Sequence, residues 1–220
     1  MAGDVIVNEH RVDKAGTKVP IEAEIRLKGD DLPYVGRGGL KLAGALERWP
    51  YLLEGCIALD VGASTGGFTD VLLQNGAARV YAVDVGHNQL AWKLRQDPRV
   101  VNLEKTHIAR LEPNRLDPAP SLGVVDVSFI SLRRVLPSMR PHLKGPGRLY
   151  ALVKPQFEVG RDQVGKGGIV RDPLHRQQAL EAIQQVGSDL NMVELGWMES
   201  PIKGTDGNVE YLICWSFEAD

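Results

Sequence analysis

The sequence contains only two cysteines in 220 residues, Cys56 and Cys214, and they lie far apart in apolar runs. Neither belongs to a CxxC pair or a regular series, so a disulfide framework and a zinc site are not expected. The five histidines show no metal-ligand spacing either, and we predict no metal centre. Two buried free thiols in a reducing cytosol are the simplest account of the cysteines.

Long apolar runs and an excess of one charge are also missing. No stretch approaches the roughly 18 uninterrupted apolar residues of a membrane helix, and the N-terminus lacks the cationic and apolar order of a signal peptide. The 26 Lys and Arg residues nearly balance the 28 Asp and Glu residues. We therefore expect a cytoplasmic protein without membrane partners, in which only a local basic patch would bind nucleic acid.

The apolar residues follow an alternating pattern of strands and helices from Cys56 onward. Strands are expected at 56–61, 78–84, 99–103, 122–127 and 147–153, and helices at about 37–49, 67–75, 88–96, 132–140 and 173–187. This alternation predicts an α/β domain with a parallel sheet and helices on both faces. The last two apolar runs have no helix between them, which predicts an antiparallel pair at one edge of the sheet.

Residues 3–28 differ from the rest, because they alternate short β-branched runs with turns. This pattern predicts a few small strands. The stretch GDDLP follows and marks a boundary. We therefore divide the chain into residues 1–30 and a main domain of residues 31–220.

The segment ALDVGASTGGFTD, residues 58–70, places a glycine-rich turn after a predicted strand. It departs from the dinucleotide fingerprint G-x-G-x-x-G, because Ser64 stands where the second glycine lets the backbone approach a pyrophosphate. Asp84 ends the next strand 22 positions after Gly62, where a carboxylate can accept hydrogen bonds from ribose hydroxyls. The pattern predicts a nucleoside ligand without closely held phosphates. Its plainer alternative is a turn that only closes a βα unit.

S-adenosylmethionine fits this description, because it joins adenosine to a cationic sulfonium and an amino acid tail. Asp60, at the end of the strand, is placed to balance the ammonium group of that tail. The expected cofactor-binding residues are Asp60, Gly62, Ala63, Ser64, Thr65, Gly66, Gly67, Phe68, Asp84, Val85 and Asp126.

A second glycine-rich segment, GRDQVGKG at residues 160–167, is similar to a phosphate-binding loop. It ends in Gly167 where Ser or Thr would bind magnesium, and no helix follows at once. We therefore reject nucleoside triphosphate binding and predict a mobile loop that covers substrate. Its cations are Arg161, Lys166, Arg171 and Arg176.

Further stretches read YVGRGGLKL (34–42), DVSFISL (126–132), LVKPQFE (152–158), VGKGGIVRD (164–172) and GNVEYL (207–212). With the glycine turn, they resemble the hemolysin A (TlyA) type of ribosomal RNA 2′-O-methyltransferase, within the FtsJ-like methyltransferases. The resemblance spans about residues 31–217 and implies a Rossmann-like methyltransferase fold, a mostly parallel seven-stranded sheet with one antiparallel strand. It also implies S-adenosylmethionine as cofactor and ribosomal RNA or ribosomal subunits as partner, with cytidine as the modified nucleoside.

The same resemblance implies a Lys-Asp-Lys-Glu tetrad at the reaction centre, carried here by Lys41, Asp126, Lys154 and Glu210. Methyl transfer from a sulfonium is an in-line displacement, in which the ribose hydroxyl must be aligned and must lose its proton. Lys154 is assigned as the base or as the group that orients the hydroxyl. Lys41 positions substrate, and the two carboxylates hold the lysines. Taken singly, Lys41 and Glu210 have a plainer reading as solvated residues.

Three aromatic residues, Phe68, Phe129 and Phe157, flank these positions. Core packing or cavity lining is the expected role of such residues. Phe157 stays open as a residue on which a base could stack. His107 stands where relatives more often carry a small polar residue, in a region expected to border the adenine.

Residues 3–28 resemble the C-terminal half of a small RNA-binding domain shared with bacterial pseudouridine synthases, through VIVN, RVDKAGTKV and AEI. The two helices that precede these strands in that domain are not in the sequence. We therefore expect residues 1–30 to be a partial RNA-binding domain.

Two other functions stay open. The family name suggests a membrane-active hemolysin, although the sequence has neither a long apolar helix nor the alternating hairpins of a pore. The second alternative is a protein that binds S-adenosylmethionine and RNA without catalysing methyl transfer. The partial N-terminal unit keeps this alternative open. Dye release from liposomes would favour the first, and tight cofactor binding without RNA methylation the second. The sequence does not indicate the oligomeric state.

Overall fold

The computed structural model describes residues 5–8, 10–12, 14, 16–23, 25–27 and 32–219. The chain divides into two compact units, Met1–Pro33 and Tyr34–Asp220. The expected boundary between residues 30 and 31 lies outside the described residues, so the domain limits stay a prediction.

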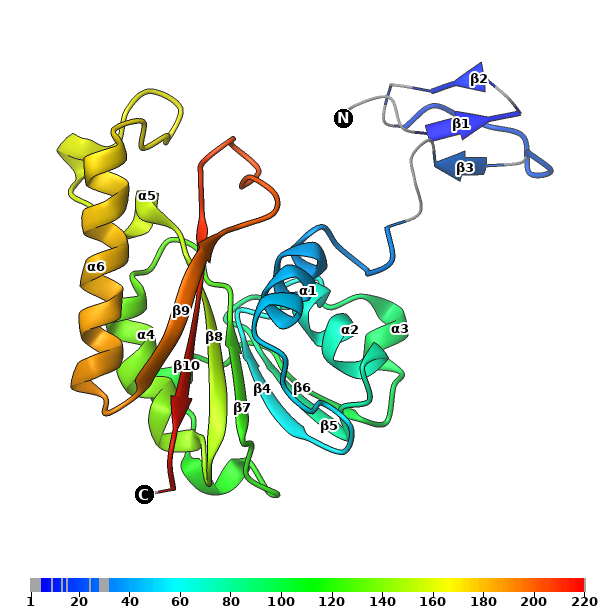
Figure 1. Ribbon diagram of the computed structural model, residues 1–220. Helices are drawn as coiled ribbons and strands as arrows, with labels where there is room; N and C mark the ends of the chain where they lie inside the picture. The colour runs from blue at the N-terminus through cyan, green and yellow to red at the C-terminus, as the bar shows by residue number, and fades with distance from the viewer. Residues whose placement is uncertain are drawn as a thin grey trace. The chain divides into compact units, whose positions relative to one another are not determined.

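The first unit contains a small antiparallel sheet with the strand order β2-β1-β3 (Figure 1). Its strands are β1 (Val5–Val7), β2 (His10–Arg11) and β3 (Ile25–Leu27). The turn after β1 passes through Asn8, whose φ of 48° is a left-handed conformation that asparagine tolerates. Small strands are what the β-branched runs of this segment predict.

The second unit is built on a seven-stranded sheet with the order β6-β5-β4-β7-β8-β10-β9 (Figure 1). The strands are β4 (Ile57–Val61), β5 (Arg79–Val83), β6 (Val100–Leu103), β7 (Leu122–Val125), β8 (Gly147–Val153), β9 (Val193–Glu199) and β10 (Tyr211–Phe217). Strands β4 to β8 are parallel, and β10 runs antiparallel between β8 and β9. The predicted α/β fold is confirmed, including one antiparallel strand near the edge.

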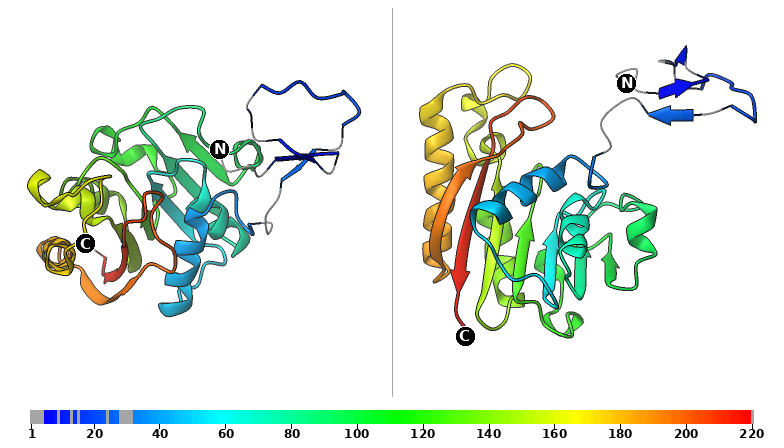
Figure 2. Two further views of the ribbon diagram at one scale, coloured as in Figure 1. Left: turned by 90° about the horizontal axis from the view of Figure 1, so that it is seen from above. Right: turned by 45° about the vertical axis from the view of Figure 1, so that its right-hand side comes forward.

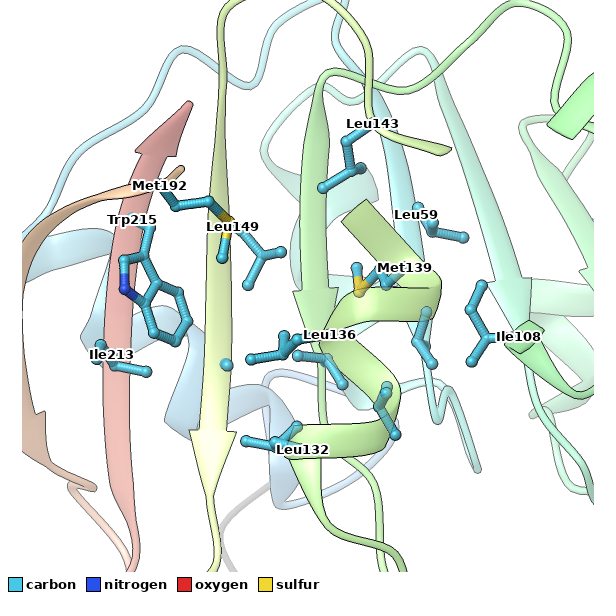
Figure 3. Packing of buried hydrophobic residues seen from close by; sticks show 14 of the residues in the cluster. Leu59, Ile108, Leu132, Leu136, Met139, Leu143, Leu149, Met192, Ile213 and Trp215 are labelled. Atoms are coloured by element: carbon cyan, nitrogen blue, oxygen red, sulfur yellow. The ribbon is translucent and has the colours of Figure 1, made fainter. Parts of the chain in front are cut away.

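Helices cover both faces of this sheet, because its central strands are apolar on both sides. Helices α1 (Gly38–Arg48), α2 (Gly67–Gln74) and α3 (Trp92–Arg95) pack on one face. Helices α4 (Leu132–Met139) and α6 (Pro173–Asp189) pack on the other (Figure 2). The core beneath α4 and α6 contains the fully buried Leu136, Met139, Leu149 and Trp215 (Figure 3). Shorter helical segments are α5 (Pro155–Glu158) and 3-10 turns at Ile108–Arg110, Pro113–Arg115, Arg140–His142 and Arg161–Gln163.

The helix predicted at 88–96 is correct only for the four residues of α3. Residues 88–90 instead form a turn whose backbone N–H groups donate to the Glu104 carboxylate at 3.0, 2.9 and 3.2 Å. The acceptor of these three N–H groups lies about 15 residues further along the chain, so the local pattern of apolar residues could not predict the turn. The predicted free, buried cysteines are confirmed.

The order of the strands reverses beside β4. The chain runs outward from β4 through β5 to β6, and then returns with β7 on the other side of β4. Ligands of open α/β sheets bind at such a reversal, beyond the carboxyl ends of the strands. The glycine turn follows β4 and Asp126 follows β7, so both lie at this point.

Candidate functional site

Two left-handed glycines shape the turn between β4 and α2. Gly62 has a φ of +86°, and a Cβ atom there would lie 2.3 Å from the Asp126 carbonyl oxygen. Gly66 has a φ of +98°, and a Cβ atom there would lie 2.2 Å from Leu94. Side chains at either position would push α3 or the segment after β7 away, so only glycine fits.

Asp84 fastens this turn to the end of β5. Its Oδ2 accepts a hydrogen bond from the N–H of Ser64 at 2.8 Å, and its Oδ1 accepts one from Gly86 at 2.7 Å. Ser64 is itself left-handed, with a φ of 50°. The carboxylate therefore orders the turn and keeps further lone pairs for a ligand.

Two ion pairs bring together the four residues of the predicted tetrad. Lys41 Nζ on α1 lies 2.6 Å from Glu210 Oε2, and Lys154 Nζ at the end of β8 lies 2.6 Å from Asp126 Oδ1. The side chains of Lys41, Lys154 and Glu210 are 10%, 11% and 3% exposed. Lys154 also donates to the Ser128 hydroxyl at 3.0 Å. Such burial is costly for charges unless they are paired, as these are.

The first cavity considered at this edge of the sheet has a volume of about 220 Å³ and adjoins both ion pairs. Its wall includes Lys41, Asp126 and Lys154, together with Gly62, Ala63, Ser64, Thr65, Gly67 and Phe68 of the turn. Glu210 does not line it, and instead lies behind Lys41. Three of the four tetrad residues thus face the same space as the glycine turn.

The second cavity, of about 350 Å³, shares Gly62, Ser64, Asp126 and Ser128 with the first. Its other walls include Asp84, Val85, His107 and Ile108. The two cavities therefore adjoin along the glycine turn. His107 is held there by accepting a hydrogen bond at Nδ1 from the N–H of Ala109 at 3.2 Å.

Asp60 and Gly66 were predicted to bind cofactor but line neither cavity. Asp60 is fully buried and accepts a hydrogen bond from the Thr69 hydroxyl at 2.6 Å. Its Oδ1 has no hydrogen-bond partner within the described part of the chain. Burial, opposed by Thr69 and assisted by Asp126 and Asp84, raises the pKa of Asp60 to about 7. Gly66 precedes α2 and acts through the shape of the turn.

Several residues that line the site were not predicted as such. Ser128 borders both cavities, and the exposed cations Arg37 and Lys203 border the first. Phe129 borders the second, is 91% exposed, and has a φ of +64°. Ser128 lies in the DVSFISL stretch, so its position was marked although its role was not. Phe129 was expected to pack in the core or to line a cavity, and it borders the second cavity without being buried.

The segment 160–171 folds differently from a phosphate-binding loop. Gly165 and Ile169 form an isolated β-bridge around Gly167 and Gly168, whose φ values are +79° and +75°. The buried Asn208 holds this hairpin by accepting from the Val170 N–H at 3.0 Å and donating to the Gly168 carbonyl at 2.8 Å.

Arg176 was predicted to lie in this loop but belongs to α6. The helix begins at Pro173 because Asp172 caps it, accepting from the Leu174 N–H at 2.9 Å. That this loop is mobile and covers substrate stays a prediction.

The described residues contain neither a metal-binding cluster nor a membrane-spanning helix. Across the described ranges, no group of three or more His, Cys, Asp or Glu side chains is arranged to hold a metal ion. No described helix has the length and apolar character needed to cross a membrane.

Comparison with known proteins gives one family. Residues 34–217 match the model of the FtsJ-like methyltransferases. The candidate rRNA methyltransferase YqxC of Bacillus subtilis is 49% identical over 214 residues, which are 97% of this chain and 76% of YqxC. The 16S/23S rRNA (cytidine-2′-O)-methyltransferase TlyA of Mycobacterium tuberculosis is 43% identical over 220 residues, 100% of this chain and 82% of that protein.

A solved structure agrees with these matches. A hemolysin candidate from Streptococcus thermophilus superimposes with a TM-score of 0.86 at 48% sequence identity. The alignment covers 99% of this chain and 80% of that one.

Proposed function

The chain belongs to the FtsJ-like methyltransferase family, and on that premise we propose that it methylates a ribose 2′-hydroxyl of ribosomal RNA, at cytidine. It is a methyltransferase that uses S-adenosylmethionine. The full-length similarity to a cytidine-2′-O-methyltransferase supports the RNA substrate. The observation that carries the proposal is the cavity in which Lys41, Asp126 and Lys154 meet the glycine turn.

The residues around the turn fit the cofactor. Gly62 lets the turn pack closely against the segment after β7, between the two cavities, and the Asp84 carboxylate would accept from the ribose hydroxyls. The second cavity, with Val85 and Ile108 in its walls, would take the adenine. When bound, S-adenosylmethionine supplies a methyl group on a sulfonium.

Lys154 is the group proposed to act on the ribose hydroxyl. The nitrogen of Lys154 donates to the Ser128 hydroxyl and forms an ion pair with Asp126, and a further position on it is open to the 2′-oxygen. In its amine form Lys154 would take the proton that the 2′-hydroxyl loses as its oxygen accepts the methyl group, and Asp126 would stabilise the resulting ammonium. The electron pair of the broken carbon–sulfur bond would stay on the sulfur of the cofactor. Lys41, held by Glu210, borders the same cavity and would position the substrate.

The target nucleoside would be held by Phe129. This aromatic ring is 91% exposed beside Ser128, and it contacts the ring of Phe157 with centroids 5.2 Å apart. Exposed rings of this kind stack on bases of unpaired nucleotides. The exposed cations Arg37 and Lys203, at the rim of the first cavity, would neutralise RNA phosphates.

The first unit is proposed to contribute RNA contacts as a partial RNA-binding domain. Each of its strands includes part of a stretch that resembles such a domain: β1 lies within VIVN, β2 includes Arg11 of RVDKAGTKV, and β3 includes Ile25 of AEI. Its contribution should add to RNA binding by the second unit.

Transfer of labelled methyl groups from S-adenosylmethionine to purified ribosomal subunits tests this function. We expect Lys154→Ala to lower kcat by roughly 10²- to 10⁴-fold, because the group that handles the proton is lost. Lys144→Ala is the matched control, since Lys144 is exposed before β8 at the opposite edge of the sheet. Equal activity of Lys154→Ala and wild type would refute the assignment of Lys154. Mass-spectrometric mapping of the methylated nucleotide would decide whether it is cytidine.

A further inference from the structure

Two short segments meet at the Lys154–Asp126 pair. Residues 154–158 follow β8, and residues 126–132 follow β7. At the start of both segments, Lys154 contacts Asp126 at 2.6 Å and Ser128 at 3.0 Å. The position of Lys154 therefore depends on the position of residues 126–132.

The far ends of the same segments are joined by Glu158. This carboxylate is 9% exposed, and it accepts from the Ser131 hydroxyl at 2.5 Å and from the Leu132 N–H at 2.8 Å. The start of α4 already has a local cap, because the Ser131 hydroxyl accepts from the Arg133 N–H at 3.1 Å. Glu158 is therefore not needed to cap α4. Its hydrogen bonds instead connect residues 154–158 to residues 126–132.

Between these two connections lies a strained residue. Phe129 has a φ of +64°, which is costly for an aromatic residue and persists only when the surroundings impose it. Its ring contacts Phe157, one residue before Glu158. Residues 126–132 are thus held at both ends against the short helix α5.

We propose that Glu158 is a positioning residue for methyl transfer, which fixes residues 126–132 so that Asp126 and Ser128 hold Lys154 in place. The effect on turnover rests on the proposed function. The effect on geometry does not, because it concerns the contacts of Lys154 alone. A displacement of about 1 Å at a reacting group is enough to lower a rate roughly 100-fold.

Amine-reactive footprinting of the full chain, read by mass spectrometry, measures the geometry without turnover. We expect Glu158→Ala to raise the acetylation rate of Lys154 several-fold, while Lys41, held by Glu210, is unchanged. Glu158→Gln should behave as wild type, because its amide can accept from Leu132 and donate to Ser131. Glu181→Gln, on the exposed side of α6, is the matched control.

Kinetics on ribosomal subunits then separate positioning from folding. Glu158→Ala should lower kcat roughly 10- to 100-fold with little change in the KM for S-adenosylmethionine. Ser131→Ala, which removes one of the two partners without removing the carboxylate, should fall between wild type and Glu158→Ala. Unchanged kcat and unchanged Lys154 reactivity in Glu158→Ala would overturn the proposal. A variant that also loses cofactor affinity and thermal stability would overturn it as well, because its lower kcat would then come from unfolding. If wild type transfers no methyl group, the proposed function fails, while the footprint still decides whether Glu158 holds Lys154.

Discussion

Asp60 is a single residue whose burial has a measurable consequence for stability. Its pKa is about 7 in the folded protein, against 3.8 for an ordinary aspartate. Between about pH 4 and pH 7 the folded state therefore holds a proton that the unfolded state has released. The free energy of unfolding should fall as the pH rises through this window.

Replacement of Asp60 by asparagine removes that titration. We expect the unfolding free energy of Asp60→Asn to depend less on pH between 4 and 7. Its total change over this window should be smaller than that of wild type by roughly a few kcal/mol. Urea unfolding at several pH values measures this slope. Asp189→Asn, exposed at the end of α6, should keep the slope of wild type. A steeper slope in Asp60→Asn would contradict the assignment.

The sequence could predict which residues lie at the candidate site, but not which of them contact one another. Asp126 and Lys154 follow apolar strands, which is where a parallel sheet gathers functional groups. That Glu210 lies behind Lys41 depends on β10 entering the sheet beside β8, a long-range pairing. The same limit applies to Glu158, because its hydrogen bonds join residues 26 and 27 positions apart.

At the scale of elements, the turn at residues 88–90 depends on Glu104. Burial alone would raise the pKa of this carboxyl, but Arg95 and the three backbone N–H groups lower it to about 2. Its contribution to stability is therefore complete above about pH 4.5, its ordinary pKa, and is lost as the pH falls toward 2.

Glu104→Gln should loosen this turn at neutral pH, because an amide is a weaker acceptor than a carboxylate for three N–H groups. We expect faster hydrogen exchange at residues 88–90, read by mass spectrometry. Affinity for S-adenosylmethionine should fall as well, since Gln89 borders the second cavity. Glu47→Gln, exposed on α1, serves as the control. Wild-type exchange rates in Glu104→Gln would show that the turn does not need the charge.

Element boundaries could be predicted where a local signal exists. The start of α6 is marked by Asp172 and Pro173, a cap followed by proline in the first turn. The start of α3 has no such signal, because the acceptor for residues 88–90 lies in the next strand region. β4 and β7 were predicted well, since buried strands appear as continuous apolar runs.

For the whole molecule, the two compact units suggest a division between RNA binding and catalysis. Removal of residues 1–33 should leave the affinity for S-adenosylmethionine unchanged, because both cavities are lined by the second unit. Affinity for ribosomal RNA should fall, since the proposed partial RNA-binding domain is lost. Calorimetry with cofactor and filter binding with RNA measure the two effects. Equal RNA affinity with and without these residues would remove the proposed role of the first unit.

The place of β10 between β8 and β9 has a consequence for synthesis of the chain. β9 leaves the ribosome before β10, the strand with which it pairs. Until β10 arrives, a nascent chain presents β9 with unpaired backbone groups and exposed Trp197 and Leu195, features that chaperones recognise and that favour aggregation. The ion pair between Lys41 and Glu210 likewise forms only after residue 210 has been synthesised, so the proposed catalytic centre is completed late.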